Sequence, residues 1–195
     1  MEDARLQAIY AAQDARIARA KQAIADEANA QNRKERVNRA RVRLLPSSTA
    51  QCDTAIWLQE QRYTEATLDI IRMVDLDTNA LSDRDCGASA LVGLGFPDHA
   101  LAFYKECAAL GTPESKRMAM RGFASLGPSA AELALPLISE ELKSPYRDRR
   151  YGAVDDLARL GPAARPLLES AAHDPEDIVR DRAVKALAGL KPLLD

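Results

Sequence analysis

The chain has few aromatic residues. They make up 5% of its 195 residues, with one Trp, five Tyr and three Phe. Its apolar volume therefore comes mainly from Ala and Leu, a composition typical of closely packed helices. Hydrophobic residues reach 47% and charged residues 29%, so the chain can bury a core and remain hydrated. This composition favours an all-α fold in one domain or in a domain with an appendage.

Cysteine is also scarce, and the three residues, Cys52, Cys86 and Cys107, include no CxxC spacing. An odd, sparse set of this kind excludes a disulfide framework and a cysteine zinc site. We expect free buried thiols. One disulfide with one free cysteine is the alternative if the protein is exported.

Long apolar runs are missing, since none approaches the ~18–20 residues that span a bilayer. Residues 1–20 are charged from the second position and contain no apolar core of a signal peptide. We therefore expect a cytoplasmic protein as the sequence is written. A periplasmic or other exported location follows if Met1 replaces a removed signal peptide.

Catalytic motifs are absent as well: the sequence contains no HExxH, GxSxG or phosphate-cradling Gly loop. The two histidines, His99 and His173, are expected in loops or at the start of a helix. The adjacent carboxylates of "VDDL" (154–157) point about 100° apart on a helix and cannot form a catalytic dyad. We expect no catalytic residue, no metal site and no cofactor, and hence no enzyme.

Charge is distributed unevenly, although the net charge is only −2. Residues 1–45 contain ten basic and six acidic residues, and the basic excess lies in "RKERVNRARVR" (33–43). This stretch is interpreted as a solvated helix face or flexible arm, with partner binding as the functional alternative. Trp57, the single tryptophan, is expected to pack in a first helix pair or to bind a partner. The candidate partner-binding residues are Arg33, Arg36, Arg39, Arg41, Arg43 and Trp57.

The strongest positive signal is an internal repeat. "SLGPSAAEL" (125–133) and "RLGPAARPL" (159–167) are near copies, 34 residues apart. Both belong to a longer pattern of a small residue, a large residue four positions later and a Leu three positions after that. The pattern closes at Leu94, Leu126, Leu160 and Leu190, with the small and large positions occupied by Gly87 and Leu91, Ala119 and Phe123, Ala153 and Leu157, and Ala183 and Leu187.

Other residues recur with this pattern. A Gly follows three of the closing leucines, where a helix ends with positive φ, and Pro128 and Pro162 come next. A base lies ten positions before each closing Leu: Arg84, Lys116, Arg150 and Arg180. We expect these bases to brace neighbouring units; an anion-binding row is the alternative. Each unit is then a helix, a tight turn and a second helix, and such units must stack to bury their apolar faces.

The C-terminal units have a recognisable family character. "DPEDIVRDRAVKALAGL" (174–190) and "LGPAARPLL" (160–168) resemble HEAT repeats of the short, bacterial, phycobilin-lyase-like type, with their D-x-x-V-R-x-x-A-x-x-A-L-x-x-L-G pattern. The resemblance covers residues 83–195, although Lys116 and Gly87 replace the usual Arg and Ala. It implies a right-handed α-solenoid of stacked antiparallel helix pairs.

Upstream, "WLQEQRYTEATLDIIRMVDLDTN" (57–79) resembles a tetratricopeptide helix pair, and residues 93–110 carry a similar second helix. Ala66 aligns with Ala100, and Tyr63 with Pro97, at the tetratricopeptide period of 34 residues. We therefore assign residues 46–82 to a tetratricopeptide-like pair and residues 83–195 to HEAT-like repeats of the same continuous solenoid.

Residues 1–45 form a separate helical, basic segment. Tyr10, Ile17 and Ile24 fall seven apart, with Leu6 and Ala20 on the flanking row. The apolar pattern ends at Gln31, and "LLPSST" (44–49) is expected to be a hinge. We expect this long helix to cap the first pair of the solenoid; docking on a partner is the alternative.

These features favour a non-enzymatic scaffold or adaptor that binds a protein or peptide on the solenoid surface. A nucleic-acid-binding solenoid that uses residues 33–43 is the alternative, although residues 46–195 are net acidic. The resemblance also allows a chromophore-lyase-like subunit, because lyases that attach bilins to cysteine have this repeat type.

Overall fold

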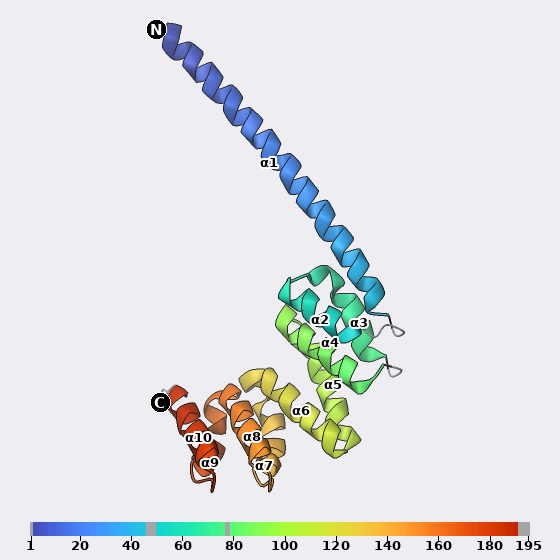
Figure 1. The fold of residues 1–195 in the computed structure, drawn as a ribbon, viewed down its shortest axis with the longest axis vertical. Helices are drawn as coiled ribbons and strands as arrows, with labels where there is room; N and C mark the ends of the chain where they lie inside the picture. The colour runs from blue at the N-terminus through green and yellow to red at the C-terminus, as the bar shows by residue number, and fades with distance from the viewer. Residues whose placement is uncertain (1, 46–49, 77–78, 191–195) are drawn as a thin grey trace.

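The computed structural model of the chain is all-helical, and it describes residues 2–45, 50–76 and 79–190, with no strand among them. Of the side chains in the first helix, it describes those of residue 19, residues 21–23 and residues 25–43. The helices follow one another along the chain and pack in antiparallel pairs, with one long helix outside the packed body (Figure 1).

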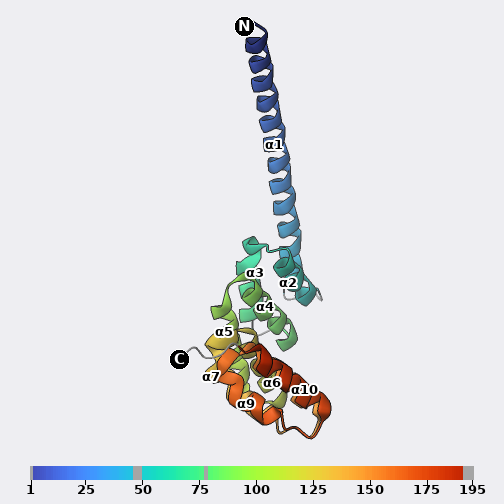
Figure 2. The same ribbon diagram turned by 90° about the vertical axis from the view of Figure 1, so that its left-hand side faces the viewer.

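That long helix, α1, runs without interruption over Glu2–Arg43 and extends away from the packed body in both side views (Figures 1 and 2). The helix continues past Gln31, where the apolar pattern of the sequence ends. Apolar periodicity reports which face is buried, whereas Ala, Arg, Lys, Glu and Gln favour helix without any buried face. The sequence face formed by Leu6, Tyr10, Ile17, Ala20 and Ile24 lies outside the described side chains.

Among the described side chains of α1, those in its last turns contact the body. Val37, Ala40 and Leu44 are buried there, whereas the described side chains at residues 25–32 are all exposed. Capping of the first helix pair is therefore limited to this end of α1. Of the expected hinge at residues 44–49, residues 46–49 lie outside the described part of the chain.

The first helix pair consists of α2 (Gln51–Glu60) and α3 (Thr67–Asp75), joined by a 3₁₀ turn at Thr64–Ala66. This is the helix–turn–helix that the sequence predicts over residues 57–79. Tyr63 is buried at the turn, and Ala66 has no exposed surface. α2 and α3 both pack against the next helix, α4 (Leu81–Leu94).

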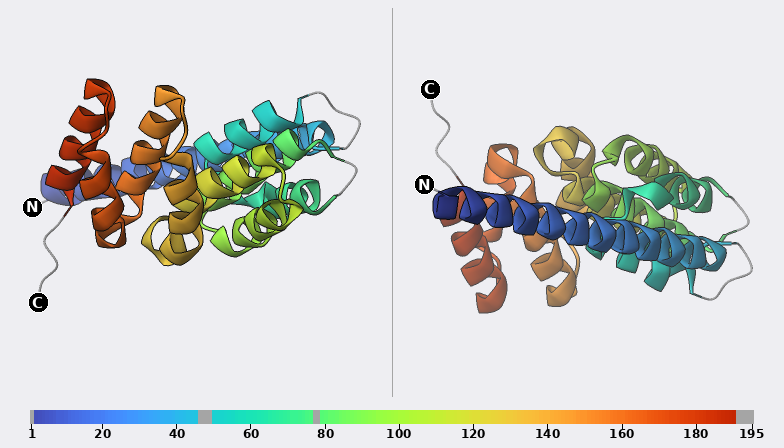
Figure 3. Two further views of the ribbon diagram at one scale, coloured as in Figure 1. Left: turned by 90° about the horizontal axis from the view of Figure 1, so that it is seen from below. Right: turned by 90° about the horizontal axis from the view of Figure 1, so that it is seen from above.

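The later pairs repeat this arrangement. α4 (Leu81–Leu94) pairs with α5 (Pro97–Leu110), α6 (Pro113–Ser125) with α7 (Ala131–Glu141), and α8 (Arg147–Arg159) with α9 (Arg165–Ala171), before α10 (Asp177–Gly189) ends the described chain. The first helix of each pair packs against the first helix of the next, α4 with α6, α6 with α8 and α8 with α10. The end-on views show these pairs following one another in a row (Figure 3).

The repeated sequence pattern marks the contact faces of this row. Leu91, Ala119, Ala153, Leu157 and Leu160 have no exposed surface, and the other residues of the pattern are buried or half-buried. The three glycines after the closing leucines have positive φ, 90° at Gly95, 74° at Gly127 and 69° at Gly161, as expected for helix-ending positions.

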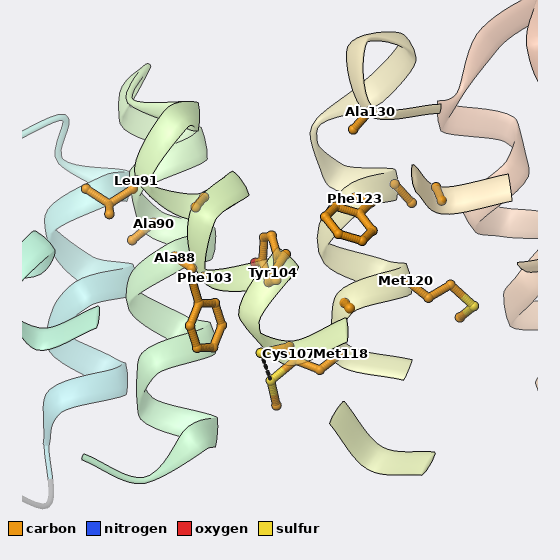
Figure 4. Packing of buried hydrophobic residues seen from close by; sticks show 14 of the residues in the cluster. Ala88, Ala90, Leu91, Phe103, Tyr104, Cys107, Met118, Met120, Phe123 and Ala130 are labelled. Carbon is orange, nitrogen blue, oxygen red and sulfur yellow. Dashed lines mark hydrogen bonds between the residues drawn. The ribbon is translucent and has the colours of Figure 1, made fainter. Parts of the chain in front are cut away.

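Three of the aromatic side chains meet in the middle of the core. Tyr104 lies between Phe103 and Phe123, with ring centroids 5.4 and 6.2 Å apart, and the Cys107 sulfur lies 3.9 Å from that of Met118 (Figure 4). Gly122 on α6 faces the Tyr104 ring so closely that a Cβ atom there would overlap it. The backbone of α6 therefore packs directly against an aromatic ring.

The expectation of three free thiols is wrong. Cys52 on α2 and Cys86 on α4 form a disulfide across 34 residues, while Cys107 is free and buried. Spacing alone does not reveal this pair. The two residues meet because α4 packs against α2, which places Cys86 beside Cys52. The structure thus has the arrangement that was the alternative, one disulfide and one free cysteine.

The basic residues of the repeat brace neighbouring helices in two clear cases. The buried Arg84 donates to the carbonyl of Val74 at 2.5 Å and to both carboxylate oxygens of Glu106 at 3.0 and 2.7 Å. Arg150 likewise donates to both oxygens of Asp174, at 2.7 and 3.0 Å.

The other two bases depart from this arrangement. Arg180 donates to the carbonyls of Asp174 and Pro175, within the loop that precedes its own helix, and Lys116 is exposed. A uniform anion-binding row is therefore not present, because three of the four bases bind groups of the protein itself.

Candidate functional site

The largest concentration of candidate residues lines a groove of about 540 Å³ where the end of α1 turns back along α2. Arg36 lies beside Trp57, and residue 43 is joined to residue 50 by the short connection, so the two helices run antiparallel. Each helix contributes positions i, i+3, i+4 and i+7, the spacing of one helix face. The lining residues are Arg36, Arg39, Ala40, Arg43, Ala50, Asp53, Thr54 and Trp57.

The floor of the groove is made of small side chains. Ala40 and Thr54 are each 5% exposed, and Ala50 is half-buried. These short side chains leave space between the two helices. The longer side chains of the lining border that space on either side.

Trp57 forms one end of the groove with its ring held in place. It packs edge-to-face against Tyr63, with ring centroids 5.3 Å apart. The guanidinium of Arg36 lies 5.3 Å from the Trp57 ring centroid and 5.7 Å from that of Tyr63. These cation–π contacts hold one positive charge over the aromatic end.

Arg39 and Arg43 line the same wall as Arg36, and both side chains are exposed. Neither forms a salt bridge or side-chain hydrogen bond within the described part of the chain. Asp53, on the facing helix, is the single acidic residue of the lining. The groove therefore carries three positive charges and one negative charge around a narrow apolar floor.

The other two candidate arginines have a different function. Arg33 donates to both carboxylate oxygens of Glu65, at 2.6 and 2.9 Å, and its guanidinium lies 4.3 Å from the Tyr63 ring centroid. Arg41 donates to Asp69 at 2.8 Å and to the Glu65 carbonyl at 2.6 Å. These contacts attach α1 to the turn and the second helix of the first pair.

The Arg33 contact changes the acidity of its partner. Hydrogen bonding from the Arg33 guanidinium lowers the pKa of Glu65 to about 2, because the donated bonds stabilise the carboxylate over the protonated acid. This contact is partly exposed, so it contributes less to stability than a buried pair with the same geometry.

Four of the six candidate residues thus meet in the groove, Arg36, Arg39, Arg43 and Trp57, while Arg33 and Arg41 serve attachment. Sequence reasoning missed Asp53 and Thr54. The signal that identifies them is the shared spacing, since residues 50, 53, 54 and 57 repeat the intervals of 36, 39, 40 and 43.

The free cysteine and the two histidines lie outside the groove. Burial raises the pKa of the free Cys107 thiol to about 11, so the thiol is protonated and unreactive at neutral pH. His99 is exposed, and His173 Nδ1 lies 2.9 Å from the Glu169 carbonyl oxygen. Among the described residues, no group of three or more His, Cys, Asp or Glu side chains is arranged to hold a metal ion.

No helix in the described part of the chain combines the length and hydropathy needed to cross a membrane. In comparisons with known proteins, no protein-family model matches the chain, and no curated protein matches it.

Proposed function

We propose that the chain is a non-enzymatic scaffold or adaptor that binds a protein or peptide partner. In this proposal the helix pairs form a right-handed α-solenoid, with HEAT-like repeats over residues 83–195 and a tetratricopeptide-like pair before them. The contacts between the first helices of successive pairs support a stacked array, because they bury the recurring positions that no single pair buries alone.

The groove between α1 and α2 is the observation that carries the proposal. Arg39 and Arg43 are exposed, line the groove beside a fixed Trp, and form no salt bridge within the described residues. Trp and Arg are the residue types that contribute most often to the energy of protein interfaces. An open groove with these side chains has the composition of a binding site.

Crosslinking in native lysate, followed by reconstitution with the purified partner, tests the scaffold function. We expect one protein to be enriched over a chain of unrelated helical fold and to bind the purified scaffold directly. A chain that retains no partner under these conditions would contradict the proposal.

Nucleic-acid binding is the second candidate, favoured by the same exposed arginines. If Arg36, Arg39 and Arg43 each contact a phosphate, affinity should fall about 40-fold between 50 and 200 mM salt, from a slope of about 0.9 per phosphate. Electrophoretic shifts with DNA and RNA at both salt concentrations measure this. No shift at low salt removes this candidate.

The disulfide supports the exported alternative for the location of the protein. Cys52 and Cys86 are both half-buried, so reductants can reach the bond. Structural disulfides persist in oxidising compartments and are rare in the reducing cytosol. We therefore assign the protein, within this proposal, to an oxidising compartment.

A further inference from the structure

The groove between α1 and α2 has a length and spacing that restrict what can occupy it. Its α1 wall extends from Arg36 to Arg43, seven residues or about 10 Å along the helix. Along that wall Arg36 and Arg39 are separated by about 4.5 Å of axial rise, and Arg39 and Arg43 by about 6 Å. The positive charges thus follow one another at intervals close to one helical turn.

A second helix presents side chains at the same intervals. Residues three and four apart on a helix lie on one face, with an average rise of 5.4 Å per turn. Carboxylates at i, i+4 and i+7 of such a helix therefore face three arginines in sequence. A β-strand instead presents same-face side chains about 6.6 Å apart, which fits the first interval of the wall poorly.

The floor favours the same occupant. Ala40, Ala50 and Thr54 allow close approach of a backbone, as small residues do between packed helices. A third helix laid along α1 and α2 would complete a three-helix arrangement there, with its small or apolar residues on the floor and its acidic residues toward the α1 wall. Asp53 on the opposite wall disfavours acidic residues on that side.

We infer that this groove binds an acidic amphipathic helix of a partner protein, through pairing of its carboxylates with Arg36, Arg39 and Arg43 and packing against Trp57. This inference rests on the proposed scaffold function and names the chemistry of its partner. The carboxylates of the bound helix complement the positive charge of the groove. Arg39 and Arg43, which form no salt bridge in the described chain, would each gain an ion-pair partner.

Synthetic helices test this inference directly. The probe is a capped, alanine-rich peptide without Trp, with glutamates at i, i+4 and i+7. A peptide of the same composition with glutamates at i, i+5 and i+6 spreads the charges around the helix, and a third peptide carries lysines in place of the glutamates. Because Trp57 is the only tryptophan, its fluorescence reports occupancy of this groove.

We expect the one-face acidic peptide to shift Trp57 emission and to bind at least about 10-fold more tightly than the spread peptide. The lysine peptide should not bind. Combined Arg39→Glu and Arg43→Glu substitutions should weaken binding at least about 30-fold, since two charge-assisted contacts become repulsive. Neither arginine forms a salt bridge in the described part of the chain, so the variant should retain its thermal stability.

The matched control reverses two charges away from the groove. Lys105 on α5 and Lys185 on α10 are exposed, so Lys105→Glu with Lys185→Glu changes the net charge equally and should leave peptide binding unchanged. A loss of binding in this control as large as that in the groove variant would assign the effect to net charge and overturn the inference.

Three other outcomes also overturn it: equal binding of the one-face and spread peptides, undiminished binding by the groove variant, or tighter binding of a 20-nucleotide DNA than of the acidic peptide. These failures are distinct from failure of the scaffold function. If a partner protein binds the groove variant as well as the parent chain, the scaffold function stands. Only the groove is then ruled out as the binding site.

Discussion

At the scale of single residues, one position of the repeat decides how closely the helix pairs approach. The residue four before each closing Leu is Ala90, Gly122, Asp156 and Ala186 in the four units. Three of these side chains are small, and Gly122 is packed directly against the Tyr104 ring. The exception, Asp156, is 6% exposed and faces the charges of Arg159 and Arg121.

Substitution Gly122→Ala should destabilise the protein by about 1–3 kcal/mol, because the added Cβ overlaps a buried ring that has no space to move. Thermal and urea unfolding measure the change. Gly152→Ala is the matched control, since nothing lies within 4 Å of its Cβ, and it should be neutral or stabilising by up to about 1 kcal/mol. Equal stability of both variants would contradict this packing.

The buried carboxylate of Asp156 should destabilise the fold at neutral pH. Burial raises its pKa despite Arg159 and Arg121, so the folded state disfavours the ionised form. Asp156→Asn should therefore raise stability at pH 7 by about 1 kcal/mol. The gain should shrink as pH falls through the raised pKa. Asp156 in the folded state is then protonated and neutral, like the Asn that replaces it, so the cost of burying a charge disappears.

Thermal unfolding at pH 7 and pH 3.5 measures whether Asp156→Asn stabilises the fold and whether that gain shrinks in acid. The neighbouring Asp155 forms a salt bridge with Arg182, so Asp155→Asn should lower stability at pH 7 instead. Stabilisation by both substitutions, or by neither, is inconsistent with a specific cost of burying Asp156.

At the scale of elements, α1 shows how far the sequence determines structure. The lack of an apolar stripe after Gln31 correctly indicates that most of this segment is exposed, but it does not indicate where the helix ends. The attachment depends on Arg33 and Arg41, whose partners Glu65 and Asp69 lie 32 and 28 residues away in sequence. No local pattern predicts such pairings, so the division of the arginines between attachment and groove required the packed structure.

The attachment of α1 should weaken in acid. The pKa of Glu65 is about 2 in the folded chain and near 4.5 when the contact is broken, so its contribution is complete above about pH 4.5 and is lost as pH falls toward 2. We expect Trp57 emission to change over this range, because Arg36 then moves from the ring. Glu65→Gln should reduce the change.

The control for this titration is Glu140→Gln. Glu140 also forms a salt bridge, with Lys143 at 2.6 Å, but it lies on α7, in a later helix pair than Trp57. Its substitution should leave the Trp57 titration unchanged. An identical effect of both variants would show that the transition is not release of α1.

At the scale of the whole molecule, the repeat is the part that sequence predicts best. The recurring small, large and Leu positions, the glycines and the helix–turn–helix before them are confirmed because each depends on local spacing. The Cys52–Cys86 pair depends instead on how two separate pairs pack, as α2 meets α4. Spacing therefore predicts the pattern within a unit and the bracing by Arg84 and Arg150, but not the contact that joins Cys52 to Cys86.

The disulfide should stabilise the fold by about 3–4 kcal/mol, as a crosslink that closes a loop of 34 residues. Intact-mass measurement of the non-reduced protein should show the loss of two hydrogens. Cys52→Ser and Cys86→Ser should each lower the thermal midpoint, and reductant should lower the midpoint of the parent chain but not that of these two variants. Cys107→Ser is the control for a thiol outside the bond; three titratable thiols in the unfolded, non-reduced protein would contradict the pairing.

The length of α1 sets the distance between its first turn and the groove at its last turns. Its 42 residues extend for about 63 Å, and the part before Arg33 measures about 45 Å. A protein attached to the first turn of α1 is therefore held at a set distance from whatever occupies the groove at its last turns. Each heptad removed from α1 would bring two such attachment points about 10 Å closer together.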